Sequence, residues 1–298
     1  MKPILFHIFG RPVFGYGVML GLSCVLGAHL AVYLSVRSGV RQKRAWGMVL
    51  LVILVGLVGG RVHDLIVNGT FTLDELFKLQ HSGRTAYGAF LAATLAGIAG
   101  AKLLKVPFWR FADAAAPTMA LGLGLTRIGC FCAGCDYGFR SNSYGFSFPI
   151  NSPAYTDQLN AGLIDKDAMV SLPVLPTQLL SSVVGFLIFA LTLRWWFRRP
   201  RREGDVILLF FGSYGLARAG LEQLRDDAGR GTLFGLSTST TIGLLTFLVA
   251  LAFALAPPLR ALRREAGEVI PFEEDEDEQE QGSDEAPGGE ADAAGASA

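Results

Sequence analysis

The sequence is poor in charge for its length. Only 17% of its 298 residues are Asp, Glu, Lys or Arg, whereas soluble proteins carry about 25%. Hydrophobic residues make up 51% of the chain and fall into long blocks rather than being scattered. This pattern excludes an ordinary soluble domain and predicts an all-α integral membrane protein.

Cysteine and histidine are also scarce, with four of each. Cys130, Cys132 and Cys135 lie close together, but zinc sites usually need four nitrogen or sulfur ligands, and no histidine lies near them in the sequence. We therefore expect no metal site, because small side chains packed within a membrane protein are the commoner outcome. The sequence leaves open whether Cys130 and Cys135 form a disulfide.

Several other signals are missing. The glycine-rich stretch at residues 121–138 lacks the Lys-Ser/Thr pair of a P-loop and follows no predicted strand. We therefore expect no nucleotide site, no cofactor and no nucleic-acid partner. Residues 1–11 contain no small-residue cleavage site, so we expect the first helix itself to direct membrane insertion.

Basic residues are missing after Arg264. Thirteen of the 26 acidic residues lie beyond it, so residues 1–264 carry a net charge of +13 and the tail neutralises them. Residues 1–264 are predicted to form the membrane domain. Residues 265–298 are acidic and then rich in Gly and Ala, without hydrophobic periodicity, which predicts a disordered cytoplasmic tail.

Seven apolar blocks are about 20 residues long, which is enough to span a bilayer. The fourth block is rich in glycine and contains Arg127, so we expect a helix that is broken or partly re-entrant as an alternative to a full span. The seven blocks are residues 13–35, 46–67, 85–104, 114–133, 177–196, 205–224 and 234–259.

The basic residues between these blocks alternate. Fifteen lie in every second connection, beginning with the one after the first block, and eight lie in the opposite connections or before the first block. Cytoplasmic loops of membrane proteins carry an excess of Lys and Arg. The pattern predicts an external N-terminus, a cytoplasmic C-terminus and a periplasmic segment at residues 139–176. It also supports the count of seven, since a wrong count would disrupt the alternation.

Three arginines, Arg61, Arg127 and Arg218, lie within apolar blocks. An arginine near the bilayer centre costs about 2.5–3.5 kcal/mol on insertion scales, and such residues usually face a cavity and mark a functional site. The structural alternative for Arg61 is a pair with Asp64, and for Arg218 a pair with Glu222 one turn along. Arg127 has no evident local acid.

A phosphate explains a guanidinium at this depth. Arginine presents a fixed fork of donors that matches phosphate oxygens, and it stays charged in any environment. The abundant phosphate in a membrane is the headgroup of a phospholipid. Arginines that converge on a cavity open to membrane lipids would hold that headgroup and stabilise charge on a leaving phosphate.

Five short motifs, in this order along the chain, resemble the prolipoprotein diacylglyceryl transferase family. Each motif is weak alone, but five in order, together with seven predicted spans, form a specific pattern. The motifs are residues 15–19 (GYGVM), 82–90 (SGRTAYGAF), 126–138 (TRIGCFCAGCDYG), 176–179 (PTQL) and 214–225 (YGLARAGLEQLR).

The resemblance implies an enzyme of the bacterial inner membrane. Such enzymes transfer the diacylglyceryl group of phosphatidylglycerol to the lipobox cysteine of a prolipoprotein signal peptide, and glycerol phosphate leaves. Arg127 would bind the lipid phosphate, and Arg218 would lie near the leaving phosphate. Arg61 is a further candidate for substrate binding because it is an arginine within an apolar block. The resemblance also implies site roles for Tyr16, Tyr87, Gly138, Tyr214 and Glu222.

The chain departs from the family at several motif positions. Tyr87 stands where many members have a histidine that has been considered a base, and Leu175 replaces another histidine. Phenols ionise only at about pH 10, so Tyr87 would orient the substrate unless nearby arginines lower its pKa. Glu222 is the other candidate base, although Arg218 and Arg225 would keep it ionised.

Two alternatives follow from these departures. One is a divergent paralogue with a different acceptor or no activity, and the other is a lipid-binding or transporter-like membrane protein. Our leading hypothesis is that the positive potential of Arg127 and Arg218 supplies most of the catalysis, because it stabilises both a thiolate and a leaving phosphate.

Overall fold

The computed structural model describes residues 4–77, 86–198, 201–226, 231–233, 235–261 and 263, and most of them are helical. The elements in chain order are β1 (Ile4–Ile8), β2 (Arg11–Phe14), α1 (Gly15–Arg37), α2 (Gln42–Val67), α3 (Leu73–Phe77), α4 (Ala86–Leu103), α5 (Phe108–Ala133), α6 (Pro153–Asn160), α7 (Thr177–Phe197), α8 (Asp205–Glu222), β3 (Thr232–Leu233), β4 (Leu236–Ser237), α9 (Thr238–Leu255) and α10 (Pro257–Ala261).

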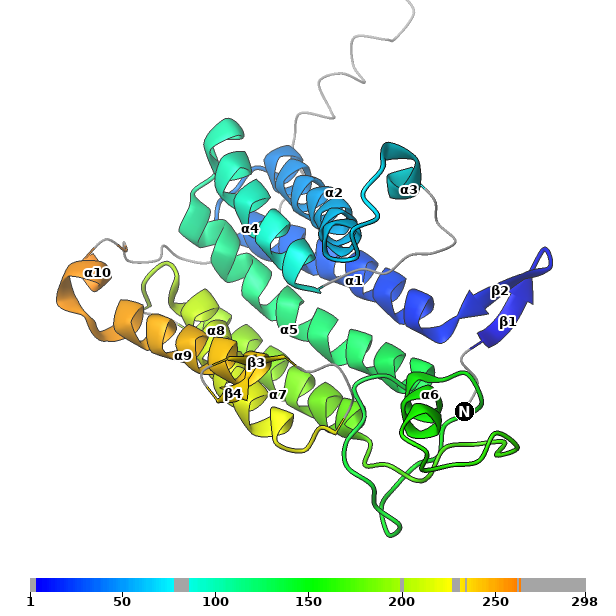
Figure 1. Cartoon of the computed structure of the whole chain (residues 1–298). Coiled ribbons are helices and arrows are strands. Elements are labelled where there is room, and N and C mark those ends of the chain that lie inside the picture. The colour runs from blue at the N-terminus through cyan, green and yellow to red at the C-terminus, as the bar shows by residue number, and fades with distance from the viewer. Residues whose placement is uncertain are drawn as a thin grey trace, which may run out of the picture.

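Helix α5 runs through the middle of the molecule (Figure 1). It packs against α1 on one side and against α7 and α8 on the other. Helices α2 and α4 form a close pair beside α1, and α8 and α9 form a second pair beside α7. The strands make only two small antiparallel hairpins among the described residues, β1–β2 and β3–β4, so the architecture is helical, as predicted.

Five of the described helices, α1, α2, α5, α7 and α9, are long and apolar enough to cross a membrane. Helix α4 is a shorter apolar helix, and α8 carries Asp205, Arg218 and Glu222. Large apolar side chains such as Leu54, Leu187 and Leu248 are more than half exposed on these helices, as expected for a surface that faces lipid. The chain is a multi-pass membrane protein.

All seven predicted blocks coincide with helices, and the fourth needs a correction. Helix α5 is continuous from Phe108 to Ala133 and begins six residues before the predicted block. It contains Pro117 within its span, yet it is not broken. Helix α5 packs against α1, α7 and α8. The glycine-rich sequence did not predict these contacts between helices.

A buried carboxylate fixes the start of α8. Asp113 of α5 is 1% exposed, and its Oδ1 accepts hydrogen bonds from the backbone N–H groups of Val206 and Ile207 at 3.0 and 3.1 Å. The first N–H groups of a helix have no partner within the helix, so this carboxylate satisfies two of them. Arg201 pairs with the same carboxylate at 2.5 Å. Helix α8 is thereby held against α5.

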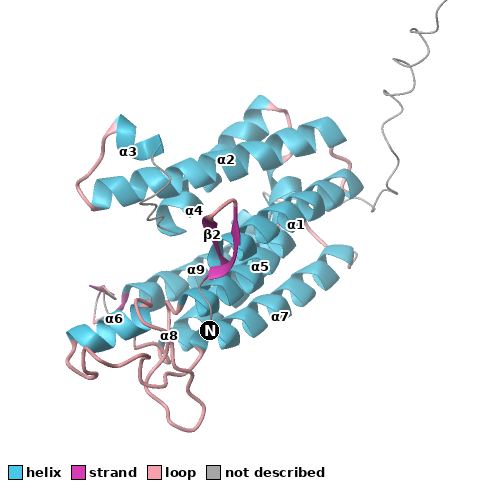
Figure 2. Ribbon diagram, turned by 90° about the vertical axis from the view of Figure 1, so that its right-hand side faces the viewer, coloured by secondary structure: helices cyan, strands magenta, loops and turns pink. Residues whose placement is uncertain are grey.

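The long connection between α5 and α7 folds over one end of the bundle and contains α6 (Figure 2). Tyr137, Phe148, Ala154 and Val174 form a small buried apolar cluster in this segment. The hydroxyl of Tyr137 donates to Asp157 at 2.8 Å. The connection is therefore an ordered cap rather than a loose loop. The predicted tail, residues 265–298, lies outside the described residues.

Close contact between α5 and α7 depends on glycine. A Cβ added at Gly185 would lie 2.7 Å from the backbone N and 2.9 Å from the Cα of Gly124. The hydroxyl of Ser182 donates to the Gly124 carbonyl at 2.7 Å. Such close approach is typical of helix packing in membranes.

We expect Gly185→Val to lower the free energy of unfolding by about 1–3 kcal/mol, because the new side chain forces the two helices apart. Thermal unfolding in detergent measures the effect. Gly21→Val is the matched control, since a Cβ at Gly21 meets nothing within 4 Å. Equal unfolding temperatures for the two variants would contradict this account of the α5–α7 contact.

Candidate active site

The ends of six helices meet at one end of the bundle. Tyr16, Tyr87, Thr177 and Ser239 lie in the first turns of α1, α4, α7 and α9, whereas Arg127 lies near the end of α5 and Arg218 near the end of α8. The N-terminus of a helix carries partial positive charge. Four helix N-termini at this end therefore add to the positive potential of the arginines, and the C-termini of α5 and α8 offset part of it.

Helix α5 ends in a turn that positions an acid. Gly134 has φ +80°, and the backbone N–H groups of Gly134 and Cys135 both donate to the carbonyl of Cys130. Asp136 follows with φ +56°, a left-handed conformation that aspartate tolerates better than most residues. The turn directs the chain back toward α5, so the carboxylate of Asp136 lies beside Arg127.

Asp136 joins two arginines from different helical segments. Its Oδ2 is 2.8 Å from Nη1 of Arg127, and its Oδ1 is 2.5 Å from Nη2 of Arg225, which follows α8. Burial by itself would raise the pKa of Asp136, but Arg127 and Arg225 outweigh that effect and hold the pKa below its ordinary value. Asp136 is therefore ionised and acts as the bridge between α5 and the end of α8.

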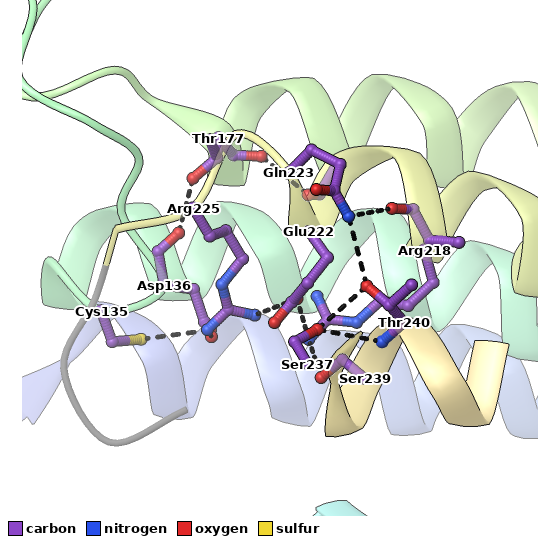
Figure 3. Close-up of polar contacts among 12 residues, drawn as sticks. Cys135, Asp136, Thr177, Arg218, Glu222, Gln223, Arg225, Ser237, Ser239 and Thr240 are labelled. Atoms are coloured by element: carbon purple, nitrogen blue, oxygen red, sulfur yellow. Dashed lines mark hydrogen bonds and ion pairs between the residues drawn. The ribbon is translucent and has the colours of Figure 1, made fainter. Parts of the chain in front are cut away.

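A second acid continues the row (Figure 3). Glu222 is 2% exposed, and its Oε2 lies 3.7 Å from Arg225 and 3.0 Å from Arg218. Arg218 also donates to Ser239 of α9 at 2.9 Å. The hydroxyl of Tyr87 lies 3.5 Å from the hydroxyl of Ser239, which links α4 to the row. We call Arg127, Asp136, Arg225, Glu222 and Arg218 the arginine row.

Two buried side chains at the start of α7 hold the loop that carries Asp136. The hydroxyl of Thr177 donates to the carbonyl of Asp136 at 2.6 Å, and the amide of Gln178 donates to the carbonyl of Cys135 at 2.6 Å. Thr177 is 2% exposed and Gln178 is fully buried. The motif at residues 176–179 therefore has a structural task, which is to fix the backbone at Cys135 and Asp136.

Gly138 makes a backbone contact at the other end of this loop. A Cβ there would lie 2.6 Å from the carbonyl oxygen of Leu224 and 2.7 Å from the Cγ2 of Thr177. Gly138 also pairs with Arg225 in an isolated β-bridge. The absence of a side chain at Gly138 thus lets the end of α8 approach the loop closely enough for Arg225 to reach Asp136.

The two remaining tyrosines lie near Arg127. Tyr16 packs against α5 at Gly129, where an added Cβ would be 3.2 Å from the tyrosine ring, and it lies within electrostatic range of Arg127 and Asp136. Tyr214 lies within electrostatic range of Arg127. Its ring stacks on the ring of Phe210, with the ring centroids 5.7 Å apart. Tyr16 is 42% exposed, so this side of the row is accessible at the surface of the bundle.

Arg61 makes its described contacts elsewhere. It pairs with Asp64 at 3.6 Å and donates to the carbonyl of Glu75 in α3 at 2.8 Å. These contacts agree with the structural alternative for this residue. Its substrate-binding role stays a prediction, as do the roles of the other predicted site residues.

The row combines three guanidiniums with two carboxylates, so it carries an excess positive charge. Such a row can accept an anionic headgroup and stabilise negative charge on a leaving phosphate. A separate groove in the described surface is lined by Leu163, Asp165, Lys166 and Pro173 of the connection between α5 and α7. Its lining includes none of the predicted site residues.

The chain matches the family model described as prolipoprotein diacylglyceryl transferase over residues 3–256. It belongs to this family. The match confirms the resemblance that the five motifs suggested.

Its relatives carry the name phosphatidylglycerol–prolipoprotein diacylglyceryl transferase. The protein of Clostridium tetani is 32% identical over 254 residues, which cover 84% of this chain and 96% of that protein. The second such transferase of Clostridium perfringens is 29% identical and is matched over its whole length and 90% of this chain. The protein of Nostoc sp. is 26% identical over 76% of this chain and 79% of its own length.

In this family member, sequence reasoning misses two members of the arginine row. Neither Asp136 nor Arg225 is predicted as a site residue from the sequence. A signal exists for Arg225, since it ends the motif at residues 214–225. The pair of Arg127 with Asp136 has no local signal, because it depends on the left-handed turn after α5.

We expect Thr177→Val to lower the free energy of unfolding by about 1 kcal/mol, since it removes one buried hydrogen bond while keeping the side-chain shape. Amide hydrogen exchange at residues 134–138 should become faster. Thr246→Val is the matched control, because Thr246 bonds only within α9, to the Ile242 carbonyl, in the described contacts. Unchanged exchange in the loop would show that Thr177 does not hold it.

Proposed function

We propose that the protein transfers the diacylglyceryl group of phosphatidylglycerol to the cysteine thiol of prolipoproteins. Membership of the family and the names of the relatives support this activity. The observation that carries the residue roles is the arginine row, in which Arg127, Arg225 and Arg218 are linked through Asp136 and Glu222. The acceptor is the lipobox cysteine of the signal peptide.

The chemistry requires one bond to form and one to break. The sulfur of the acceptor attacks the glyceryl carbon that carries the phosphate, so a C–S bond forms and the C–O bond breaks. The electron pair of that bond stays on the oxygen of the departing glycerol phosphate, and the thiol proton leaves to solvent or to that phosphate. The reaction therefore needs a site that stabilises a thiolate and a phosphate in turn.

Each end of the row has a separate task in this proposal. Arg127 binds the phosphate of the lipid, and Arg218 stabilises the glycerol phosphate as it departs. Arg225 and the two acids hold these guanidiniums in place, so little reorganisation is needed when charge develops. Tyr16 and Tyr214 line the Arg127 end, whereas Tyr87 orients the substrate at the Arg218 end through Ser239.

The membrane arrangement follows the distribution of basic residues. Helices α1, α2, α4, α5, α7, α8 and α9 are proposed as seven spans, with the N-terminus outside and the C-terminus in the cytoplasm. The row then lies toward the outer face of the bacterial inner membrane. Both phosphatidylglycerol and the exported acceptor reach this face, and the phospholipid enters from the side.

We expect Arg127→Lys and Arg218→Lys each to lower diacylglyceryl transfer by about 100-fold or more, since a lysine cannot reproduce the fork of donors. Transfer from phosphatidylglycerol to a lipobox peptide by the purified protein measures this. Arg110→Lys is the matched control, because Arg110 pairs with Glu203 away from the row.

Retained transfer in both row variants would overturn the assigned roles. Bound phosphatidylglycerol without any transfer by the wild type, across several lipobox peptides, would instead favour the lipid-binding alternative. Complementation of a bacterial strain depleted of its own transferase tests the same activity in the cell.

A further inference from the structure

Three potential metal ligands lie together at the end of α5. The sulfurs of Cys130 and Cys135 and a carboxylate oxygen of Asp136 are all within 4.8 Å of one another. We infer that these residues form a site for a thiophilic divalent cation such as Zn²⁺, with an open position for the acceptor thiol. The role of the metal rests on the proposed function, whereas binding of the metal does not.

The turn that ends α5 is what brings the two cysteines together. Where a helix ends in a left-handed glycine, the fourth residue before that glycine and the residue just after it come into contact. Gly134 is that glycine, and the N–H of Cys135 bonds the carbonyl of Cys130 at 3.3 Å. This turn therefore brings two residues that are five apart in the chain into contact, and Cys130 and Cys135 have this separation.

The ligand set suits zinc. Catalytic zinc sites have three protein ligands and keep the fourth tetrahedral position for water or substrate. Ligand atoms about 2.0–2.3 Å from a tetrahedral zinc lie roughly 3.5–3.8 Å from each other. Cys135 Sγ and Asp136 Oδ2 are 3.7 Å apart, so this pair has the required separation without movement.

The surroundings hold the ligands and offset their charge. Asp136 accepts from Arg127 and Arg225, and a carboxylate oxygen has a second lone pair for the metal. Gln178 and Thr177 fix the backbone of Cys135 and Asp136. Two thiolates, one carboxylate, a divalent cation and the two guanidiniums together carry a charge of +1, so a metal-loaded site remains compatible with an anionic lipid.

A metal at this site would activate the acceptor thiol. Phenols ionise only at about pH 10, so Tyr87 leaves activation of the acceptor thiol to the positive potential of the arginines alone. A free thiol is only about 3% ionised at pH 7, and coordination to zinc deprotonates a thiol outright. The acceptor thiol would release its proton to solvent on binding, and the coordinated sulfur would then attack the glyceryl carbon. Sequence reasoning does not predict this site, because it does not show that Asp136 lies beside the two sulfurs.

Metal content and spectroscopy test the site without relying on activity. We expect the full-length protein, purified in detergent, to bind about one zinc per chain by elemental analysis. Replacement by Co²⁺ should give thiolate-to-cobalt charge-transfer absorption. Cys130→Ser and Cys135→Ser should lose both signals, whereas Cys24→Ser, a change in α1 outside the cluster, should retain them.

Activity then tests the role. Removal of the metal with 1,10-phenanthroline should lower transfer at pH 7 by roughly 10- to 30-fold, in line with the thiolate fraction, and added Zn²⁺ should restore it. The loss should shrink as pH rises toward about 8.5, because the free thiol then ionises by itself. This measurement uses the wild-type chain, so it does not depend on the folding of any variant.

The outcomes separate the two proposals. Transfer by a zinc-free protein that is unaffected by chelator would overturn the metal site and leave the proposed function intact. Zinc bound through the cysteines without transfer by any preparation would support the site and overturn the proposed function. A disulfide between Cys130 and Cys135, shown by loss of both thiols to labelling until reduction, would overturn the site in favour of a redox pair.

Discussion

The pairing of one carboxylate, Asp136, with arginines from two different helical segments is the interaction on which the rest of the site depends. Arg127 comes from α5 and Arg225 from the short segment that follows α8. Without an acid between them, two buried guanidiniums would repel each other in a medium of low dielectric. With Asp136 in place, they form one end of a row that continues through Glu222 to Arg218.

Much of the surrounding fold positions that carboxylate. The left-handed turn after α5 brings Asp136 back toward Arg127, and the buried side chains of Thr177 and Gln178 hold the turn from α7. At the opposite end of the bundle, Asp113 binds the first N–H groups of α8. Helix α8 is therefore fixed at its start by one aspartate, and the chain just after it is held through Arg225 by another.

The same turn gives the site a second chemical character. It places two sulfurs beside the carboxylate that joins the arginines, so groups suited to a soft metal lie next to groups suited to phosphate. In the two proposals, the first set binds the metal that activates the acceptor thiol and the second set binds the phosphate of the lipid. The proximity of the two sets is a property of this fold that neither set explains by itself.

The sequence by itself determined the membrane class, the helical segments, the family and most of the arginines, because apolar runs, charge alternation and short motifs are local features. It did not determine that α5 is continuous, that Arg61 contacts α3, or that Asp136 and Arg225 complete the row. These features depend on contacts between residues that lie far apart in the chain. Asp136 meets Arg225 only after α5, α7 and α8 have packed together, so only the tertiary structure decided which charges face each other.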